Sequence, residues 1–160
     1  MKTVVIGAGA SGMMCAATAC SYGAEVFLIE RNDRCGRKLA ITGKGRCNVT
    51  NACSRDEFLS AVIRNPRFLY SAWSAFSSED TMAFFESLGV PLKVERGNRV
   101  FPVSDRAFDV SGALERRLRG LKVAIVRDRA VALDIADGAV KSVNGEKKSL
   151  SVTSSLVSLP

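Results

Sequence analysis

The pattern of hydrophobic and polar positions at the start of the chain predicts a strand, a helix and a second strand. Residues 3–7 form a short apolar run, typical of a strand buried on both faces of a parallel sheet. Residues 11–22 are rich in alanine and methionine and contain no proline, which favours a helix that ends at Gly23. Residues 25–30 are mostly apolar and predict the second strand. We therefore expect a right-handed β-α-β unit at the N-terminus.

The central part of the chain contains signals for three further helices. Residues 54–57 have the form of a capping box and open the first of these helices. Aromatic and apolar residues at three- and four-residue spacings over 68–76 predict the second helix, whose aromatic face we interpret as a packing surface rather than a flavin-stacking surface. Ser77 or Ser78 can cap the third helix, which ends at Gly89.

The last part of the chain contains short strands, two tight turns and one helix. Gly97-Asn98 and Asp137-Gly138 are typical of hairpin turns. The helix is expected over residues 105–119. The strands are expected over 92–94, 99–101, 123–126, 130–135 and 140–143. The strand over 130–135 can share one sheet with the N-terminal β-α-β unit.

The spacing of Gly7, Gly9 and Gly12, between the first strand and the first helix, is that of a dinucleotide-binding turn. Gly7 must end the strand in a tight turn, Gly9 must let backbone N–H groups approach a pyrophosphate, and Gly12 must let the helix lie against the strand. The helix N-terminus then presents unpaired donors and its positive dipole end to the phosphates.

Glu30 ends the second strand about 20 residues beyond the glycines, where a carboxylate can accept hydrogen bonds from an adenosine ribose. A solvated acid at the end of a strand is the alternative interpretation. The carboxylate would repel a 2′-phosphate in spite of the adjacent Arg31, so NADP is disfavoured at this position. FAD and NAD remain as candidate ligands.

A basic loop follows Glu30 and reaches residue 51. Its glycines, Gly36, Gly43 and Gly45, permit a close backbone approach, so the loop can wrap the pyrophosphate and the ribityl side of a long cofactor. A solvated basic loop is the alternative, and the absence of interleaved aromatic residues disfavours nucleic-acid binding. The basic residues of the loop are Arg31, Arg34, Arg37, Lys38, Lys44 and Arg46, against the single acid Asp33.

The elements and the glycine turn together predict an α/β fold: a Rossmann-like FAD/NAD(P)-binding fold with a parallel sheet and a β-hairpin or meander insertion. With 160 residues, 47% of them hydrophobic, the chain is long enough for one domain with a core, and we expect a single domain over residues 1–160. Residues 149–160 contain no glycine and form an atypical tail.

Composition excludes several classes of site. The chain has no histidine, so a Ser/His/Asp triad, a histidine base and a histidine metal site are excluded, and we expect no metal. Five cysteines without Cys-x-x-Cys spacing favour reduced thiols in the cytoplasm, with Cys47 and Cys53 unpaired. The N-terminus lacks the pattern of a signal peptide, and no apolar run could span a membrane. The net charge of +7 permits anionic ligands of many kinds.

Three segments resemble the BaiN-like flavoproteins, the aminoacetone-oxidase-type NAD(P)/FAD-dependent oxidoreductases. These segments are residues 7–12, Glu30-Arg31, and residues 36–51 with the string Thr-Gly-Lys-Gly-Arg-Cys-Asn-Val-Thr-Asn. The resemblance implies that the glycine turn holds the FAD pyrophosphate, that Glu30 and Arg31 hold the ribose end, and that the loop lines the cofactor toward the isoalloxazine. The residues implied are Gly7, Gly9, Ala10, Ser11, Gly12, Arg37, Lys38, Thr42, Gly43, Arg46 and Asn48.

The same resemblance implies roles for two later positions, Arg99 and Val131. Residues 95–107 are similar to a family segment near the substrate and the flavin, which makes Arg99 a candidate for binding an anionic substrate group; a plain surface arginine is the alternative. Val131 matches a strand position whose backbone contacts adenine. The resemblance is expected to end near residue 145, where the family continues with an apolar strand ending in Ala-Thr-Gly-Gly, so we expect a truncated or frameshifted copy.

The sequence therefore predicts a FAD-dependent oxidoreductase, or its N-terminal fragment, that transfers a hydride through a non-covalent flavin. NAD(P)H is a candidate electron donor. A catalytically inactive module that binds ADP-containing ligands is the alternative function. We assign no catalytic acid or base, expect neither nucleic acid nor a membrane as partner, and leave the small-molecule substrate and the oligomeric state open.

Overall fold

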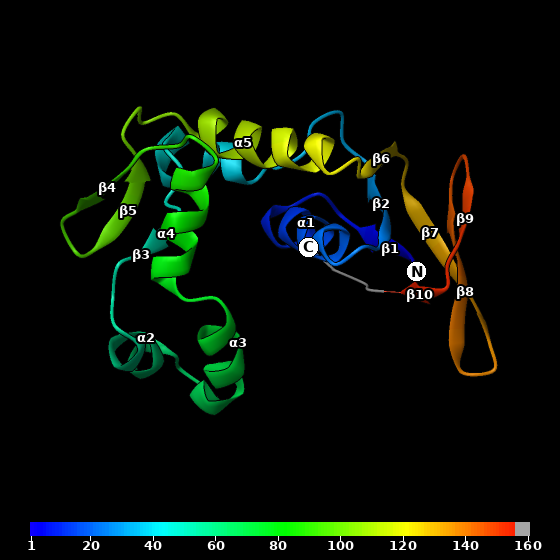
Figure 1. Ribbon diagram of the computed structural model, residues 1–160, viewed down its shortest axis with the longest axis horizontal. Coiled ribbons are helices and arrows are strands. Elements are labelled where there is room, and N and C mark those ends of the chain that lie inside the picture. Colours follow the sequence, from blue (N-terminus) through cyan, green and yellow to red (C-terminus); the bar gives the residue numbers. More distant parts are fainter. Residues whose placement is uncertain (156–160) are drawn as a thin grey trace. The chain divides into compact units, whose positions relative to one another are not determined.

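The computed structural model describes residues 1–155, and the chain folds as two compact units (Figure 1). The first unit contains Met1–Leu39 and the chain from Leu114 onward, and the second contains Ala40–Ala113. The expectation of a single domain over residues 1–160 stays a prediction.

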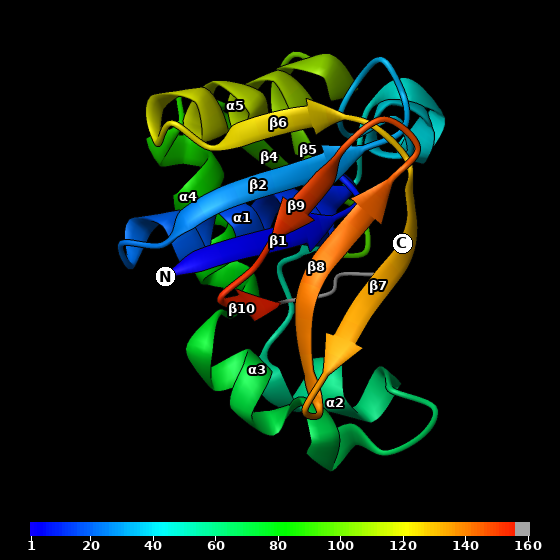
Figure 2. The ribbon, with the colours of Figure 1, turned by 90° about the vertical axis from the view of Figure 1, so that its right-hand side faces the viewer.

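The first unit is built on a four-stranded parallel sheet. Its strands are β1 (Lys2–Ile6), β2 (Glu25–Glu30), β6 (Ala124–Arg127) and β10 (Ser154–Ser155), in the order β10-β1-β2-β6. All three neighbouring pairs are parallel (Figure 2). Helix α1 (Ala10–Ser21) connects β1 to β2, so the predicted β-α-β unit is confirmed.

The two central strands of the parallel sheet, β1 and β2, are mostly buried, and their buried positions are largely apolar. Val4, Val5 and Leu28 have almost no exposed surface, and Met13 and Ala16 of α1 are buried as well. Gly23 follows α1 with a φ of +84°, a left-handed conformation that ends the helix.

A second sheet of the first unit is an antiparallel meander formed by β7 (Ala130–Ala136), β8 (Ala139–Gly145) and β9 (Ser149–Ser151). Val143 and Val152 pack with Val4 and Ile29 in one core cluster, so the meander covers a face of the parallel sheet. The suggestion that the strand at 130–135 shares the sheet of the β-α-β unit is wrong, because β6 occupies that place. The two-residue turn at Asp137-Gly138 makes antiparallel pairing with β8 local, whereas a parallel neighbour needs a crossover.

Asp128 lies in the segment that connects β6 of the parallel sheet to β7 of the meander. Its carboxylate accepts hydrogen bonds from the backbone N–H groups of Arg129, Lys147 and Lys148, at 2.8, 3.1 and 3.0 Å. Burial acts to raise the pKa of Asp128, but these N–H groups together lower it. A Cβ at Gly145 would lie 2.2 Å from Asp128 Oδ2, so only glycine fits beside this carboxylate.

The segment we expected to be an atypical tail supplies strands to both sheets. Residues 149–151 form β9, and β10 pairs with β1 through Thr3 and Val4. Residues 156–160 of that tail lie outside the described residues.

The second unit combines short helices with a three-stranded antiparallel sheet of order β3-β5-β4. The helix α5 (Ala107–Gly120) begins in this unit and ends in the first. The other elements are a kinked 3₁₀ segment η1 (Leu39–Gly45), β3 (Thr50–Asn51), α2 (Arg55–Ala61), η2 (Pro66–Leu69), α3 (Tyr70–Ala75), α4 (Ser78–Ser87), β4 (Leu92–Glu95) and β5 (Arg99–Pro102).

Local signals in the second unit are mostly confirmed. Ser54 with Glu57 forms the expected capping box of α2, and Ser77 with Asp80 forms a second box that opens α4. Asn98 adopts a φ of +57° in the turn between β4 and β5. The helix expected from residue 105 begins only at Ala107, because Asp105 has a φ of +55°.

The aromatic segment over 68–76 is divided between η2 and α3. Trp73 stacks on Phe58 with ring centroids 4.4 Å apart, in keeping with a packing role. Phe68 and Ile63 are nevertheless 83% and 96% exposed. No helix among the described residues is long and apolar enough to cross a membrane.

Candidate functional site

The glycine turn between β1 and α1 has three glycines with three different roles. Gly7 has a φ of +93°, which lets the chain leave β1 in a tight turn. A Cβ at Gly12 would lie 1.8 Å from the carbonyl oxygen of Gly7, so α1 approaches the strand at this point more closely than any side chain permits. A Cβ at Gly9 would meet no atom within 4 Å. The turn is therefore tightly packed at Gly12 and open at Gly9.

The N-terminus of α1 is free of acidic groups. Gly9 is the N-cap residue and supplies no side-chain hydrogen bond, and the first turn of the helix contains no acidic residue. The exposed residues Ala10 and Ser11 begin the helix. An anion at this end would meet backbone N–H groups and the positive end of the helix dipole.

The turn is held on both sides of Ala8. The Ala8 N–H donates to Glu30 Oε2 at 2.8 Å, and the Ala8 carbonyl accepts from the N–H of Gly36 at 2.7 Å. Glu30 is only 7% exposed. The structure therefore shows a role that the sequence did not reveal: Glu30 holds the glycine turn through the N–H of Ala8.

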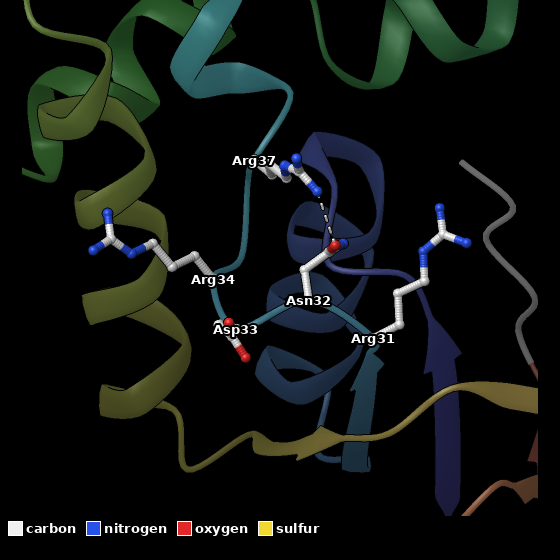
Figure 3. A pocket seen from close by; sticks show the side chains of 5 residues that line it. All are labelled: Arg31, Asn32, Asp33, Arg34 and Arg37. Carbon is white, nitrogen blue, oxygen red and sulfur yellow. Dashed lines mark hydrogen bonds between the residues drawn. The ribbon is translucent and has the colours of Figure 1, made fainter.

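Asn32 is a residue of this region that sequence reasoning missed. Its backbone N–H and its side-chain Nδ2 both donate to Glu30 Oε1, at 2.8 and 2.6 Å. Its side-chain oxygen accepts from Arg37 Nη1 at 3.3 Å, as Figure 3 shows. A short amide two residues after a strand-ending acid is a signal for such local hydrogen bonding, and it could have drawn attention to this position.

Three arginines line an open pocket of about 470 Å³ after β2. Arg31 and Arg34 extend to opposite sides of the chain, while Arg37 points toward Asn32 (Figure 3). Arg31, Arg37 and the adjacent Lys38 are exposed. The complete lining is Arg31, Asn32, Asp33, Arg34 and Arg37. The predicted residues Arg31 and Arg37 thus lie together, at the end of the strand that carries Glu30.

Two predicted residues of the second unit, Gly43 and Arg46, lie close to Phe101 of β5. A Cβ at Gly43 would lie 3.0 Å from the Phe101 ring, and the Arg46 guanidinium lies 4.1 Å from the ring centroid. Arg46 also pairs with Glu95 at 2.9 Å and with Asp105 at 3.3 Å. The hydrogen bond to Glu95 is the main cause that raises the pKa of Arg46. Arg46 is therefore held by two carboxylates and one aromatic ring.

Three other predicted residues lie close to this cluster in the chain. The Asn48 amide, oriented so that its nitrogen donates, reaches the carbonyl oxygens of Val100 and Thr50 at 3.2 and 3.0 Å. Thr42 accepts from the N–H of Cys47 at 3.0 Å. Arg99 is exposed, and its Nε donates to the carbonyl of Arg96 at 3.0 Å. Val131, from the first unit, is 57% exposed on β7.

The five cysteines are all free thiols. Burial raises the pKa of the Cys47 thiol, although a hydrogen bond with Thr42 acts in the opposite direction. Burial also raises the pKa of Cys35, against the lowering effect of Arg127. These thiols are therefore poor nucleophiles at neutral pH. Within residues 1–155 no group of acidic and cysteine side chains could hold a metal ion.

A glycine turn after the first strand of a parallel sheet, a carboxylate at the end of the second strand and a meander on the sheet face define a Rossmann-type domain of the kind found in flavin-dependent oxidoreductases. The chain belongs to the family of HI0933-like proteins, whose Rossmann-domain model matches residues 1–159. The family expected from the sequence is confirmed, and the match continues beyond residue 145, where we expected the resemblance to end.

Two relatives support this membership. The chain is 39% identical over 153 residues to a 3-dehydro-bile acid delta(4,6)-reductase of Clostridium scindens, covering 89% of this chain and 35% of the relative. It is also 39% identical over 88 residues to a ribosomal RNA dihydrouridine synthase of Escherichia coli, covering 54% of this chain and 21% of that protein. The chain thus spans about a third or less of the length of these relatives.

A solved structure confirms the fold. The 3-ketosteroid-delta4-(5alpha)-dehydrogenase of Rhodococcus jostii RHA1 matches with a TM-score of 0.71 at 15% identity, over 97% of this chain and 44% of that one. The Rossmann-like α/β fold predicted from the sequence is therefore present.

Proposed function

We propose that the chain binds FAD non-covalently at the glycine turn and forms the FAD-binding part of a flavin-dependent oxidoreductase. The observation that carries this proposal is the contrast between Gly12, where a Cβ would meet Gly7 O at 1.8 Å, and Gly9, where it would meet nothing within 4 Å. Packing explains the first glycine, whereas the second leaves open space at the turn that a ligand can approach. A pyrophosphate fits this open position, because an uncapped helix N-terminus follows it.

In this proposal the two ends of the cofactor meet different parts of the chain. Glu30 would accept from the adenosine ribose, with Arg31 beside it and the backbone of Val131 near the adenine. Arg37 and Lys38 would neutralise the phosphates. Thr42, Gly43, Arg46 and Asn48 would line the cofactor toward the isoalloxazine, and Arg99 would bind an anionic group of the substrate.

The bound flavin would supply the redox chemistry by exchanging a hydride with NAD(P)H or with an organic substrate. The residues of this chain would bind and orient it, and we assign none of them as a catalytic acid or base. Because the two relatives are named for a bile acid and for ribosomal RNA, the proposal leaves the substrate open.

A small-molecule substrate and a cytoplasmic location complete the proposal. The basic residues Arg31, Arg37 and Lys38 are exposed, and in this proposal they would meet the cofactor phosphates, so the proposal includes no nucleic-acid or membrane partner. Five free thiols fit a reducing compartment. Titration with ribosomal RNA fragments tests whether nucleic acid is a partner. Saturable binding of these fragments would contradict the proposal of a small-molecule substrate.

The decisive experiment is reconstitution of the chain with FAD, followed by desalting and a visible spectrum. We expect retained yellow flavin at close to one equivalent per chain. Calorimetry with FAD, NAD and ADP then separates the two functional candidates. Tighter binding of FAD than of ADP supports a flavoprotein, whereas equal affinities would mean that the flavin ring is not recognised and would favour the ADP-binding module.

A further inference from the structure

We propose that Asn32 is a positioning residue that holds the Glu30 carboxylate and the Arg37 guanidinium for a single adenosine diphosphate group. One amide side chain would thereby couple recognition of the ribose to recognition of the phosphates. This inference rests on the proposed function, and it assigns a role to a residue that has no place in the glycine turn itself.

The first step of the argument is the contact between Asn32 and Glu30. Two donors of Asn32, its backbone N–H and its Nδ2, meet the same carboxylate oxygen, Oε1. The other oxygen, Oε2, accepts from the N–H of Ala8 in the glycine turn. Because donors on both sides fix the two oxygens, the carboxylate of this buried side chain has one orientation beneath the turn.

The second step is the contact between Asn32 and Arg37. The Asn32 side-chain oxygen accepts from Arg37 Nη1 at 3.3 Å, and the two side chains point toward one another in the pocket (Figure 3). Arg37 is otherwise exposed, on a long side chain with many rotamers. The amide oxygen therefore selects the rotamer that keeps the guanidinium over the pocket.

The third step is the anchoring of Asn32 itself. Its backbone carbonyl accepts from Arg127 Nη1, at the end of β6, at 3.1 Å. Arg127 also lies 3.5 Å from the sulfur of Cys35. The residue is thus tied to the parallel sheet through its neighbours on two strands, β2 and β6.

The chemistry of this position requires an amide. The side chain must donate to a carboxylate and accept from a guanidinium at the same time, which asparagine can do and an ionised aspartate cannot. Asp33, the acidic residue in the pocket lining, is adjacent in sequence and offers a natural comparison. The substitution Asn32→Asp keeps the acceptor for Arg37 but places a second carboxylate against Glu30.

The test compares ADP with 2′,3′-dideoxy-ADP, which lacks both ribose hydroxyls, by calorimetry on the full chain. For Asn32→Asp we expect a roughly tenfold loss of ADP affinity, as for a lost charge-assisted hydrogen bond. Affinity for the dideoxy ligand should fall less, because Arg37 keeps its acceptor and only the added negative charge in the pocket opposes the phosphates. Asn32→Ala should weaken both ligands, and ADP more than the dideoxy ligand.

Asp33→Asn is the matched control, since it removes a charge from the same pocket and should shift both ligands equally. Thermal unfolding of each variant checks that the fold is retained. An equal loss for both ligands in Asn32→Asp would show a merely structural role and overturn the inference. If the wild-type chain binds both ligands equally, ribose recognition is absent and the inference fails while FAD binding stands. If it binds neither ADP nor FAD, the proposed function itself is wrong.

Discussion

The two compact units bury their apolar side chains to very different extents. In the first unit the parallel sheet is covered by α1 on one side and by the meander on the other, and Val5 and Leu28 have no exposed surface. The second unit buries Val100 and Phe101, but Ile63 and Phe68 of its helical part remain almost fully exposed.

Because of this difference in burial, the two units would hold a ligand by different means. The glycine turn and Glu30 stand on a framework of buried strands, whereas Arg46 is held by two ion pairs and one aromatic ring. Segments with few buried contacts open at low free energy. We therefore expect the adenosine side of the proposed site to be rigid and the flavin side to be the more easily rearranged.

The largest effect should come from a core truncation in the first unit. Leu28→Ala removes a fully buried side chain of β2 and should lower the free energy of unfolding by about 3 kcal/mol. The matched change in the second unit, Phe68→Ala, should alter it by less than about 0.5 kcal/mol. Urea unfolding followed by circular dichroism measures both. A comparable loss for Phe68→Ala would show that its ring is covered in solution.

A smaller effect on the free energy of unfolding is expected from substitutions at Gly9 and Gly12 of the turn. Gly12→Ala should cost about 2 kcal/mol, because the new Cβ meets a backbone carbonyl and the gain in helix propensity offsets only part of that clash. Gly9→Ala should leave stability unchanged and instead weaken ADP binding, since its Cβ fills the open position. Thermal unfolding measures the stability of both variants, and calorimetry measures their ADP affinity. Unchanged ADP affinity in Gly9→Ala would place the phosphates elsewhere.

The smallest effect concerns two aspartates whose pKa values are lowered by different means. For Asp128, burial raises the pKa and three backbone N–H groups more than compensate, whereas Asp105 is lowered chiefly by its hydrogen bond with Lys93 and further by Arg46. A folded pKa below the unfolded one means that each carboxylate stabilises the protein above about pH 4 and that this stabilisation is lost as the pH falls through the folded value.

Asp128→Asn and Asp105→Asn should therefore destabilise the chain at pH 7 and converge with the wild type in acid. Added salt should reduce the effect of Asp105→Asn, whose partners are exposed side chains, and leave that of Asp128→Asn unchanged. Thermal unfolding at low and high salt, across the acid range, provides the measurement. An Asp128→Asn effect that disappears with salt would contradict the backbone explanation.

The sequence predicted local structure well where a few adjacent residues decide it. The β-α-β unit, the capping box at Ser54, the cap at Ser77 and the turns at Gly97-Asn98 and Asp137-Gly138 depend on short-range propensity and hydrogen bonding. The partner of β2 could not be read in this way. The strands 124–127 and 130–136 are both short and apolar, and only the antiparallel turn after β7 decides which of them joins the parallel sheet.

The sequence offered positions for the candidate site, which stay predictions, but it did not show the contacts among these residues. The glycine spacing and Glu30 form a motif, and motifs show which residues face a ligand. They do not show that Glu30 braces Ala8, or that Asn32 bridges Glu30 and Arg37, because those bonds depend on the path of the loop after β2. The grouping of Gly43 and Arg46 around Phe101 likewise joins residues distant in sequence.

The order of strands in the parallel sheet has a consequence for biosynthesis. The central pair, β1 and β2, is translated first, but its flanking strands β6 and β10 follow only after the whole second unit. The hydrogen bond from Lys2 to Thr153 joins residues separated by 151 positions. At a translation rate of roughly 5–20 residues per second, both outer edges of the β1–β2 pair stay unpaired for several seconds. Slow ribosomal transit would prolong this aggregation-prone interval, so a chaperone bound early to the nascent chain should raise the yield of folded protein.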